Sequence, residues 1–172
     1  ARWTRILWAE AESGKMNCTA LNLAAKLKAE GNEVNLKDPV ASFKALYNLG
    51  AYGIEYRPYG DRLYVAEGNL VITHGKYVSR HSGWSAKRTW EWLGKSCIVG
   101  HTHRLGSYLI TQDGCEMGAW ENGCLCNLEP EYDDAPNWQQ GFSVVKIDGP
   151  MFHVIQVPII KEKGKTRAVY HE

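Results

Sequence analysis

Residues 96–103 read Ser-Cys-Ile-Val-Gly-His-Thr-His, an apolar run that ends in a glycine and two histidines. Residues 68–74, Gly-Asn-Leu-Val-Ile-Thr-His, repeat this order of an apolar stretch followed by a histidine. Short continuous apolar runs are typical of strands that are buried on both faces. A helix is predicted between them over residues 82–93, ended by Gly94. Two core strands joined by one helix usually run parallel, so both histidine ends are predicted at one edge of a sheet.

The pattern around this unit predicts an α/β fold in which helices precede strands. Upstream, apolar residues at helical spacing predict helices over residues 2–12 and 19–29, and Asp38-Pro39 opens a third that Gly50 closes. Alternating residues predict strands at 53–56, 62–65, 108–111, 116–120, 143–147 and 152–158, with a hairpin turn at 59–61. We expect one domain over residues 1–160, helical over 1–50 and carrying the histidine motifs and strands over 51–160. Residues 161–172 are expected to form an exposed basic tail.

The composition is that of a globular protein whose net charge creates no strong electrostatic field. Of 172 residues, 44% are hydrophobic and 23% charged, and 20 Lys plus Arg stand against 19 Asp plus Glu. The formal net charge of +1 provides no global attraction for nucleic acid or an acidic membrane, so an anionic ligand must be held locally. No apolar run approaches the roughly 18–20 residues of a membrane span.

Several features suggest a cytoplasmic protein, and the start of the chain suggests a fragment. An odd number of cysteines, five, suits reduced thiols better than a disulfide framework. The first residue is Ala1 rather than Met, and residues 1–12 already have the pattern of a mid-domain helix. We therefore expect that a leader was removed or that the chain is part of a longer protein.

The histidines have the spacing of metal ligands. His101 and His103, at i and i+2 in extended backbone, project to the same side, and His74 would end the neighbouring strand. Imidazole suits zinc, iron, manganese or similar ions, and the sequence does not choose among them. Neutral nitrogens leave a divalent ion's charge uncompensated, so carboxylates are expected nearby. None of the six aspartates belongs to an Asp-x-His unit at a strand end; they are Asp38, Asp61, Asp113, Asp133, Asp134 and Asp148. Exposed loop histidines are the plain alternative.

Thr73-His74-Gly75 and Gly100-His101-Thr102-His103 resemble the last two motifs of the calcineurin-like metallophosphoesterases. The resemblance implies that His74 and His101 bind one divalent metal ion and that His103 binds a second. It also implies that the family's carboxylate motifs and its proton-donating histidine lie upstream, so that no catalytic residue is present in this chain. Gly31-Asn32-Glu33 and Gly60-Asp61 look like two of the missing motifs, but their context and order do not fit.

A longer resemblance, over roughly residues 50–160, is to the phage and bacterial branch described as exonuclease-like phosphoesterases. It is carried by Tyr56-Arg57-Pro58-Tyr59-Gly60, Arg80-His81-Ser82, residues 100–106, residues 121–126 and residues 136–142. It implies a β-sandwich flanked by helices, with the N-terminal strands missing from this chain. It also implies metal-dependent hydrolysis of phosphate mono- or diesters by a binuclear centre in the intact parent, with two divalent ions such as Mn, Fe or Zn.

Residues close to the histidines in sequence are candidate substrate contacts. Arg80, His81 and Arg104 could bind phosphate oxygens, or they could be solvated surface charges. Trp138, Gln139 and Gln140 could stack on and hydrogen-bond a base; alternatively, Trp138 is an interior anchor and the two amides fix its loop. The expected partner is a phosphoester substrate, possibly a nucleic acid, and no membrane.

Two other functions compete with hydrolysis. The chain could be a non-catalytic remnant domain that binds nucleic acid or a protein partner. It could also be a structural zinc module in which Cys115, Cys124 and Cys126 join the histidines, although the Cys-x-Cys spacing is unusual for zinc.

Overall fold

The computed structural model describes residues 49–57, 60–112, 114–129, 136–168 and 170. The chain divides into two units, residues 1–59 and 60–172, and each is described by itself. In the first unit a short 3-10 helix, η1 (Leu49–Tyr52), precedes residues 53–57, which form no strand. The strand predicted at 53–56 is therefore wrong. The helices predicted at 2–12 and 19–29, and the third up to residue 48, lie outside the described residues.

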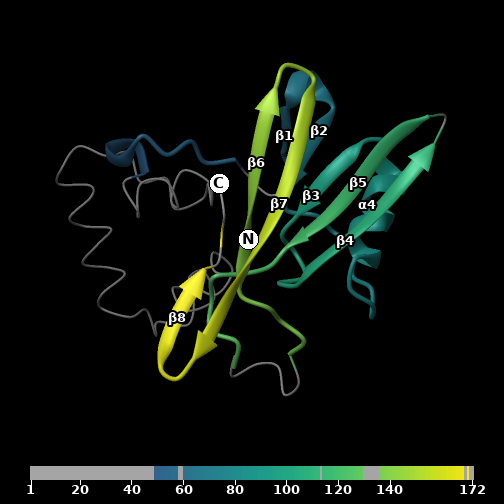
Figure 1. Ribbon diagram of the computed structural model, residues 1–172. Helices are drawn as coiled ribbons and strands as arrows, with labels where there is room; N and C mark the ends of the chain where they lie inside the picture. The colour runs from purple at the N-terminus through teal and green to yellow at the C-terminus, as the bar shows by residue number, and fades with distance from the viewer. Residues whose placement is uncertain (1–48, 58–59, 113, 130–135, 169, 171–172) are drawn as a thin grey trace, which may run out of the picture. The chain divides into compact units, whose positions relative to one another are not determined.

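The second unit is built on a five-stranded mixed sheet (Figure 1). Its strands are β1 (Arg62–Val65), β2 (Leu70–Thr73), β3 (Ser96–Val99), β4 (Leu105–Gln112) and β5 (Cys115–Asn122), in the spatial order β1-β2-β3-β5-β4. The central pairs β2–β3 and β3–β5 are parallel, whereas β1–β2 and β4–β5 are antiparallel. The predicted parallel pairing of the two apolar runs is confirmed. A second 3-10 turn, η2 (Ala66–Gly68), joins β1 to β2.

Helix α4 (Trp84–Leu93) connects β2 to β3 and covers one face of this sheet. Gly94, at φ +64°, ends the helix in the left-handed conformation, and its N–H donates to the carbonyl of Trp90. The helix packs Ala86, Trp90 and Leu93 against alternate residues of the strands, namely Val71, Cys97, Val99 and Ala119. The predicted helix at 82–93 is thus confirmed apart from its first two residues.

A three-stranded antiparallel sheet covers the other face of the five-stranded sheet. Its strands are β6 (Gly141–Asp148), β7 (Met151–Glu162) and β8 (Lys165–Ala168), in sequence order. Val145, Phe152 and Val154 pack against Leu70 and Ile98, whose side chains point away from α4. The apolar runs at β2 and β3 are continuous because both of their faces are covered. The described residues therefore form an α/β fold of two sheets and one α-helix.

Part of the segment predicted as a basic tail forms a strand pair. β7 continues to Glu162, and β8 pairs back on it through Ile159–Ala168 and Glu162–Lys165. The basic side chains of this hairpin are exposed, as expected, but the backbone that carries them is a strand pair rather than a frayed end. In the described part of the chain, no helix has the length and hydropathy needed to cross a membrane.

The packing of the core predicts how shortening a side chain changes the stability of the second unit. Leu70 is fully buried between the two sheets, so Leu70→Ala should lower the free energy of unfolding by about 2–5 kcal/mol. Leu109 is 71% exposed, so Leu109→Ala should change it by less than about 0.5 kcal/mol. Urea denaturation of the two variants measures both values, and equal losses would contradict the described packing.

Candidate functional site

His74 and His101 meet at the carboxyl edge of the two central parallel strands. His74 follows β2, His101 comes two residues after β3, and the N–H of Gly100 donates to the carbonyl of His74, which extends the strand pairing. Nδ1 of His101 lies 3.0 Å from Nε2 of His74, and the two rings meet edge to face with centroids 4.9 Å apart. The prediction that both strands deliver their histidines to one place is confirmed.

Gly75 permits this close approach. Its φ is +84°, a conformation that side-chain-bearing residues rarely adopt, and a Cβ there would lie 3.2 Å from Val99 and 3.7 Å from His101. The chain can therefore turn away from the sheet directly after His74 without pushing His101 aside.

His103 is held separately from this pair, against Trp138. The two rings are edge to face with centroids 4.4 Å apart, and the N–H of Gln139 donates to the carbonyl of His103 over 2.9 Å. The backbone of His103 has φ +58°, which is uncommon for a residue other than glycine. Its Nδ1 is buried and has no hydrogen-bond partner among the described residues. Trp138 is partly buried, so the interpretation of Trp138 as an interior anchor agrees with this arrangement.

His74 and His103 favour the neutral, metal-binding form. Although His74 stays partly exposed, burial lowers its pKa below the ordinary value, and the nearby His101 and His103 lower it further. Burial, and secondly His101, also lower the pKa of His103. A neutral imidazole can coordinate a cation, whereas a protonated one cannot.

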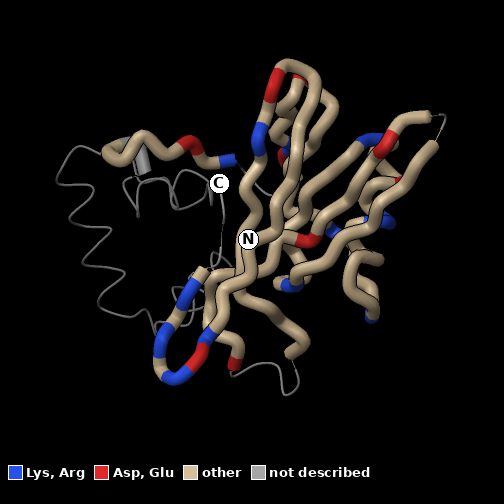
Figure 2. The backbone as a smooth tube through the Cα atoms, viewed as in Figure 1, with Lys and Arg blue, Asp and Glu red and all other residues tan. Residues whose placement is uncertain are grey.

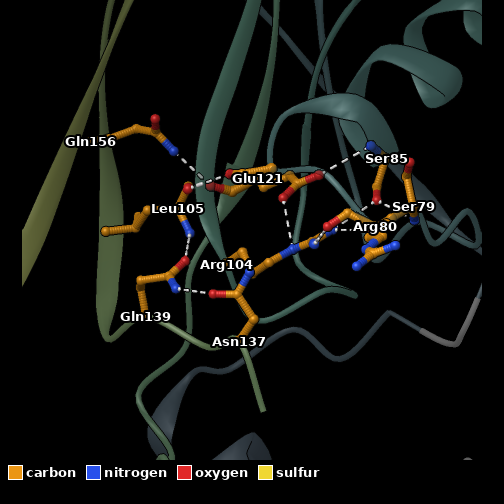
Figure 3. Close-up of polar contacts among 10 residues, drawn as sticks. Ser79, Arg80, Ser85, Arg104, Leu105, Glu121, Asn137, Gln139 and Gln156 are labelled. Carbon is orange, nitrogen blue, oxygen red and sulfur yellow. Dashed lines mark hydrogen bonds and ion pairs between the residues drawn. The ribbon is translucent and has the colours of Figure 1, made fainter. Parts of the chain in front are cut away.

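A buried ion pair fixes the segment that follows His103 (Figure 3). Nε of Arg104 lies 3.3 Å from Oε2 of Glu121, and the side chains are 7% and 0% exposed. The direction of the N–H bond does not make this contact a hydrogen bond, so its attraction is that of two opposite charges. The other Glu121 oxygen accepts the backbone N–H of Ser85, in the first turn of α4.

The guanidinium of Arg104 also binds the loop between β2 and α4. It donates to the carbonyls of Arg80 and Ser79 over 3.1 and 2.8 Å, and to the hydroxyl of Ser85 over 3.2 Å. These contacts give Arg104 a structural role. Arg80 and His81 have exposed side chains, and their contact with a substrate stays a prediction.

Amide side chains hydrogen-bond the loop that carries Trp138 to neighbouring segments of the chain. Oε1 of Gln139 accepts the N–H of Leu105, and Nε2 of Gln140 donates to the carbonyl of Cys126. Gln139 and Gln140 thus fix the loop, which is the structural one of their two predicted roles. Glu121 as the partner of Arg104 was missed, because nothing local in the sequence pairs residues 17 positions apart.

The histidines fit a metal ion in part. A separation of 3.0 Å between two imidazole nitrogens is compatible with two ligands of one ion bound at about 2.1 Å, and the unpartnered nitrogen of His103 is a further donor. Among the described residues, however, no group of three or more His, Cys, Asp or Glu side chains is arranged to hold an ion. The carboxylate of Glu121 is engaged by Arg104 and Ser85.

The four cysteines that the structure describes do not join this site. Cys115 begins β5, whereas Cys124 and Cys126 follow the end of that strand. Burial, and secondly a hydrogen bond with Cys126, raise the pKa of Cys124 to about 11, which disfavours the thiolate that a metal requires. Cys97 lies in the core, and burial raises its pKa to about 12.

Comparison with known proteins finds two similar phage proteins. The chain is 29% identical to the "Gene 54 protein" of Mycobacterium phage L5 over 129 residues, and 30% identical to the "Gene 54 protein" of Mycobacterium phage D29 over 129 residues. Each alignment covers 69% of this chain and 49% of the relative, so the chain spans about half the length of the curated relatives it matches. No family model and no solved structure matches the chain.

Removing the charge of Glu121 should destabilise the fold strongly. Glu121→Gln keeps the side chain's shape but leaves Arg104 buried without its counter-ion, which typically costs about 3–5 kcal/mol of unfolding free energy. Glu91→Gln breaks only the exposed pair with Lys87 and should cost less than about 0.5 kcal/mol. Urea denaturation compares the two, and a Glu121→Gln loss as small as the control's would show that the pair is unimportant.

Stability should fall with acid through the histidines. Because the pKa values of His74 and His103 are lowered in the folded state, the unfolded chain binds protons more readily. Their effect is absent well above the ordinary pKa of 6.5 and grows as the pH falls from there towards the folded-state values. Unfolding midpoints of the metal-free protein at pH 7.5 and 5.5 should therefore differ more than those of His74→Asn. His153→Asn, at an exposed position of β7, is the matched control for the loss of an imidazole. An unchanged difference in His74→Asn would refute the assignment.

Proposed function

We propose that this chain is the histidine-bearing part of a metallophosphoesterase, a β-sandwich enzyme that hydrolyses phosphate mono- or diesters with two divalent metal ions. One observation carries the proposal. Two imidazole nitrogens from adjacent parallel strands face each other over 3.0 Å at the strand ends, where open α/β sheets commonly bind ligands.

The proposed roles follow from the placement of each side chain. Nε2 of His74 and Nδ1 of His101 would hold one ion, and His103 would contribute to the second. Divalent ions bound there would polarise the phosphoester and activate water for its hydrolysis. Arg80 and His81 are the candidates for contact with phosphate oxygens. Arg104 is left out of that set because its guanidinium is bound to Ser79, Arg80, Ser85 and Glu121.

The remaining ligands are proposed to come from the rest of a longer parent protein. The described residues offer histidines without a matching group of carboxylates, and the phage relatives are about twice as long as the part aligned with this chain. This chain alone should then bind a metal weakly and hydrolyse little.

Mn²⁺ binding tests the paired histidines. Isothermal titration of the 172-residue chain should detect one weak site at neutral pH, and His101→Ala should weaken it at least about tenfold because one of two ligands is lost. His153→Ala is the matched control, since His153 lies exposed on β7, and it should bind Mn²⁺ like the unsubstituted chain. Unchanged binding by His101→Ala would contradict the pair as a site.

Two further measurements separate the competing functions. Hydrolysis of bis(p-nitrophenyl) phosphate with Mn²⁺ should be fast only for a chain extended upstream; equal turnover by this chain would contradict the proposal that essential ligands lie there. If Mn²⁺ binds but neither chain hydrolyses the ester, the result favours the non-catalytic remnant. Metal loss on Cys124→Ala, and not on His74→Ala, would favour the structural zinc module.

A further inference from the structure

A surface of interleaved cations and rings lies on the outer side of α4 and on the loop that begins at His74. It consists of Arg62 at the start of β1, Lys76 and Tyr77 in the loop, and Arg88 and Trp92 on α4; we refer to it as the aromatic–cation surface. Trp92 is 47% exposed, and Lys76 and Arg88 are also exposed. Trp92 therefore offers part of its ring to solvent beside positively charged groups that are also open to solvent.

The members of the surface are in direct contact. The guanidinium of Arg62 and the ammonium of Lys76 lie 4.3 and 4.0 Å from the centre of the Trp92 ring. Arg88 lies 4.9 Å from the centre of the Tyr77 ring, and the two rings are 6.3 Å apart, edge to face. Three cations thus converge on two neighbouring rings.

These cations lack acidic partners in the part of the chain that the structure describes. No described carboxylate lies within ion-pair distance of Arg62, Lys76 or Arg88; of the acidic residues next to them in sequence, Glu91 is paired with Lys87. Asp61 precedes Arg62 and uses its backbone carbonyl to accept the Thr73 hydroxyl. Three like charges held around one pair of rings repel one another unless an anion lies among them. The arrangement therefore fits an anionic partner.

We propose that the aromatic–cation surface binds single-stranded nucleic acid. A single strand presents a phosphate for each cation and an unstacked base for each ring, and alternating cations and aromatic rings are the usual means by which proteins hold such strands. A duplex hides its base faces, and an acidic peptide would use the cations but leave the rings unused. When a base stacks on Trp92, Arg62 or Lys76 moves from the ring to the adjacent phosphate.

The position of this surface also suggests a substrate class for the proposed hydrolysis. Lys76 and Tyr77 follow His74 by two and three residues, so a strand held there would run beside the loop that carries the histidine. This step alone rests on the proposed function. The binding itself does not, because it requires neither metal nor His74.

A second basic region provides a matched control. Lys161, Lys163, Lys165 and Arg167 are exposed on the β7–β8 hairpin, where basic residues are seen along the tube (Figure 2), and no cation–ring contact is found there among the described residues. If charge alone binds nucleic acid, this hairpin should contribute as much as the aromatic–cation surface.

Fluorescence anisotropy with a labelled 20-nucleotide oligo(dT) tests the proposal on the 172-residue chain. Trp92→Ala should weaken binding about 5- to 100-fold because a stacked base is lost, whereas Trp92→Phe should keep most of the affinity. Lys76→Ala with Arg88→Ala should also weaken it and reduce the salt slope by about 1.4, or about 0.7 per phosphate contact. Lys161→Ala with Lys165→Ala should change affinity less than threefold, and a duplex of equal length should bind more weakly.

Each opposite result overturns the proposal. Binding that survives Trp92→Ala and Lys76→Ala/Arg88→Ala, in variants shown by circular dichroism to be folded, would exclude this surface. If the hairpin variant Lys161→Ala with Lys165→Ala loses as much affinity, binding depends on positive charge in general and not on the aromatic–cation surface. Displacement of oligo(dT) by polyglutamate at equal concentration of charge would point to an acidic protein instead. His101→Ala should bind oligo(dT) normally even if it no longer binds Mn²⁺, so failure of the proposed hydrolysis is distinguished from failure of this inference.

Discussion

The buried pair of Arg104 and Glu121 is the constraint on which the candidate site depends. Glu121 sits at the end of β5, next to β3, and its carboxylate reaches the first turn of α4 through the N–H of Ser85. Arg104, directly after His103, reaches in the other direction to the loop between β2 and α4. A single pair of charges therefore connects the end of β5, which lies beside the end of β3, to the first turn of α4 and to the loop between β2 and α4. Buried charges are costly to desolvate, so such a pair is better explained by the geometry it fixes than by net stability.

The strands and loops around this ion pair set the positions of the histidines. The parallel pairing of β2 and β3 brings His74 and His101 together, and the turn at Gly75 makes room for the second ring. His103 keeps its uncommon backbone conformation because Trp138 lies against its ring, Gln139 binds its carbonyl, and Arg104 anchors the next residue. A metal site needs donors that are already oriented, and the strand pairing orients the two paired rings before any ion binds.

The sequence predicted the central unit well because its signals are local. Continuous apolar runs at β2 and β3, a helical stretch between them and terminal glycines all point to the same arrangement. Contacts between distant residues were harder to predict. Arg104 follows a histidine motif and so resembled a phosphate contact, but its burial depends on Glu121, 17 residues away. The strand expected at 53–56 had the right alternation, yet β1 pairs with β2 instead. The hairpin of β7 and β8 was missed because basic residues on an exposed strand read as a solvated tail.

The central claim is that His74 and His101 share one metal ion, and a crystal structure of the chain grown with Zn²⁺ tests it most directly. The account predicts an anomalous difference peak about 2.0–2.1 Å from both Nε2 of His74 and Nδ1 of His101. A peak at Cys124 or elsewhere, with the two imidazoles still in contact and no ion between them, would contradict it.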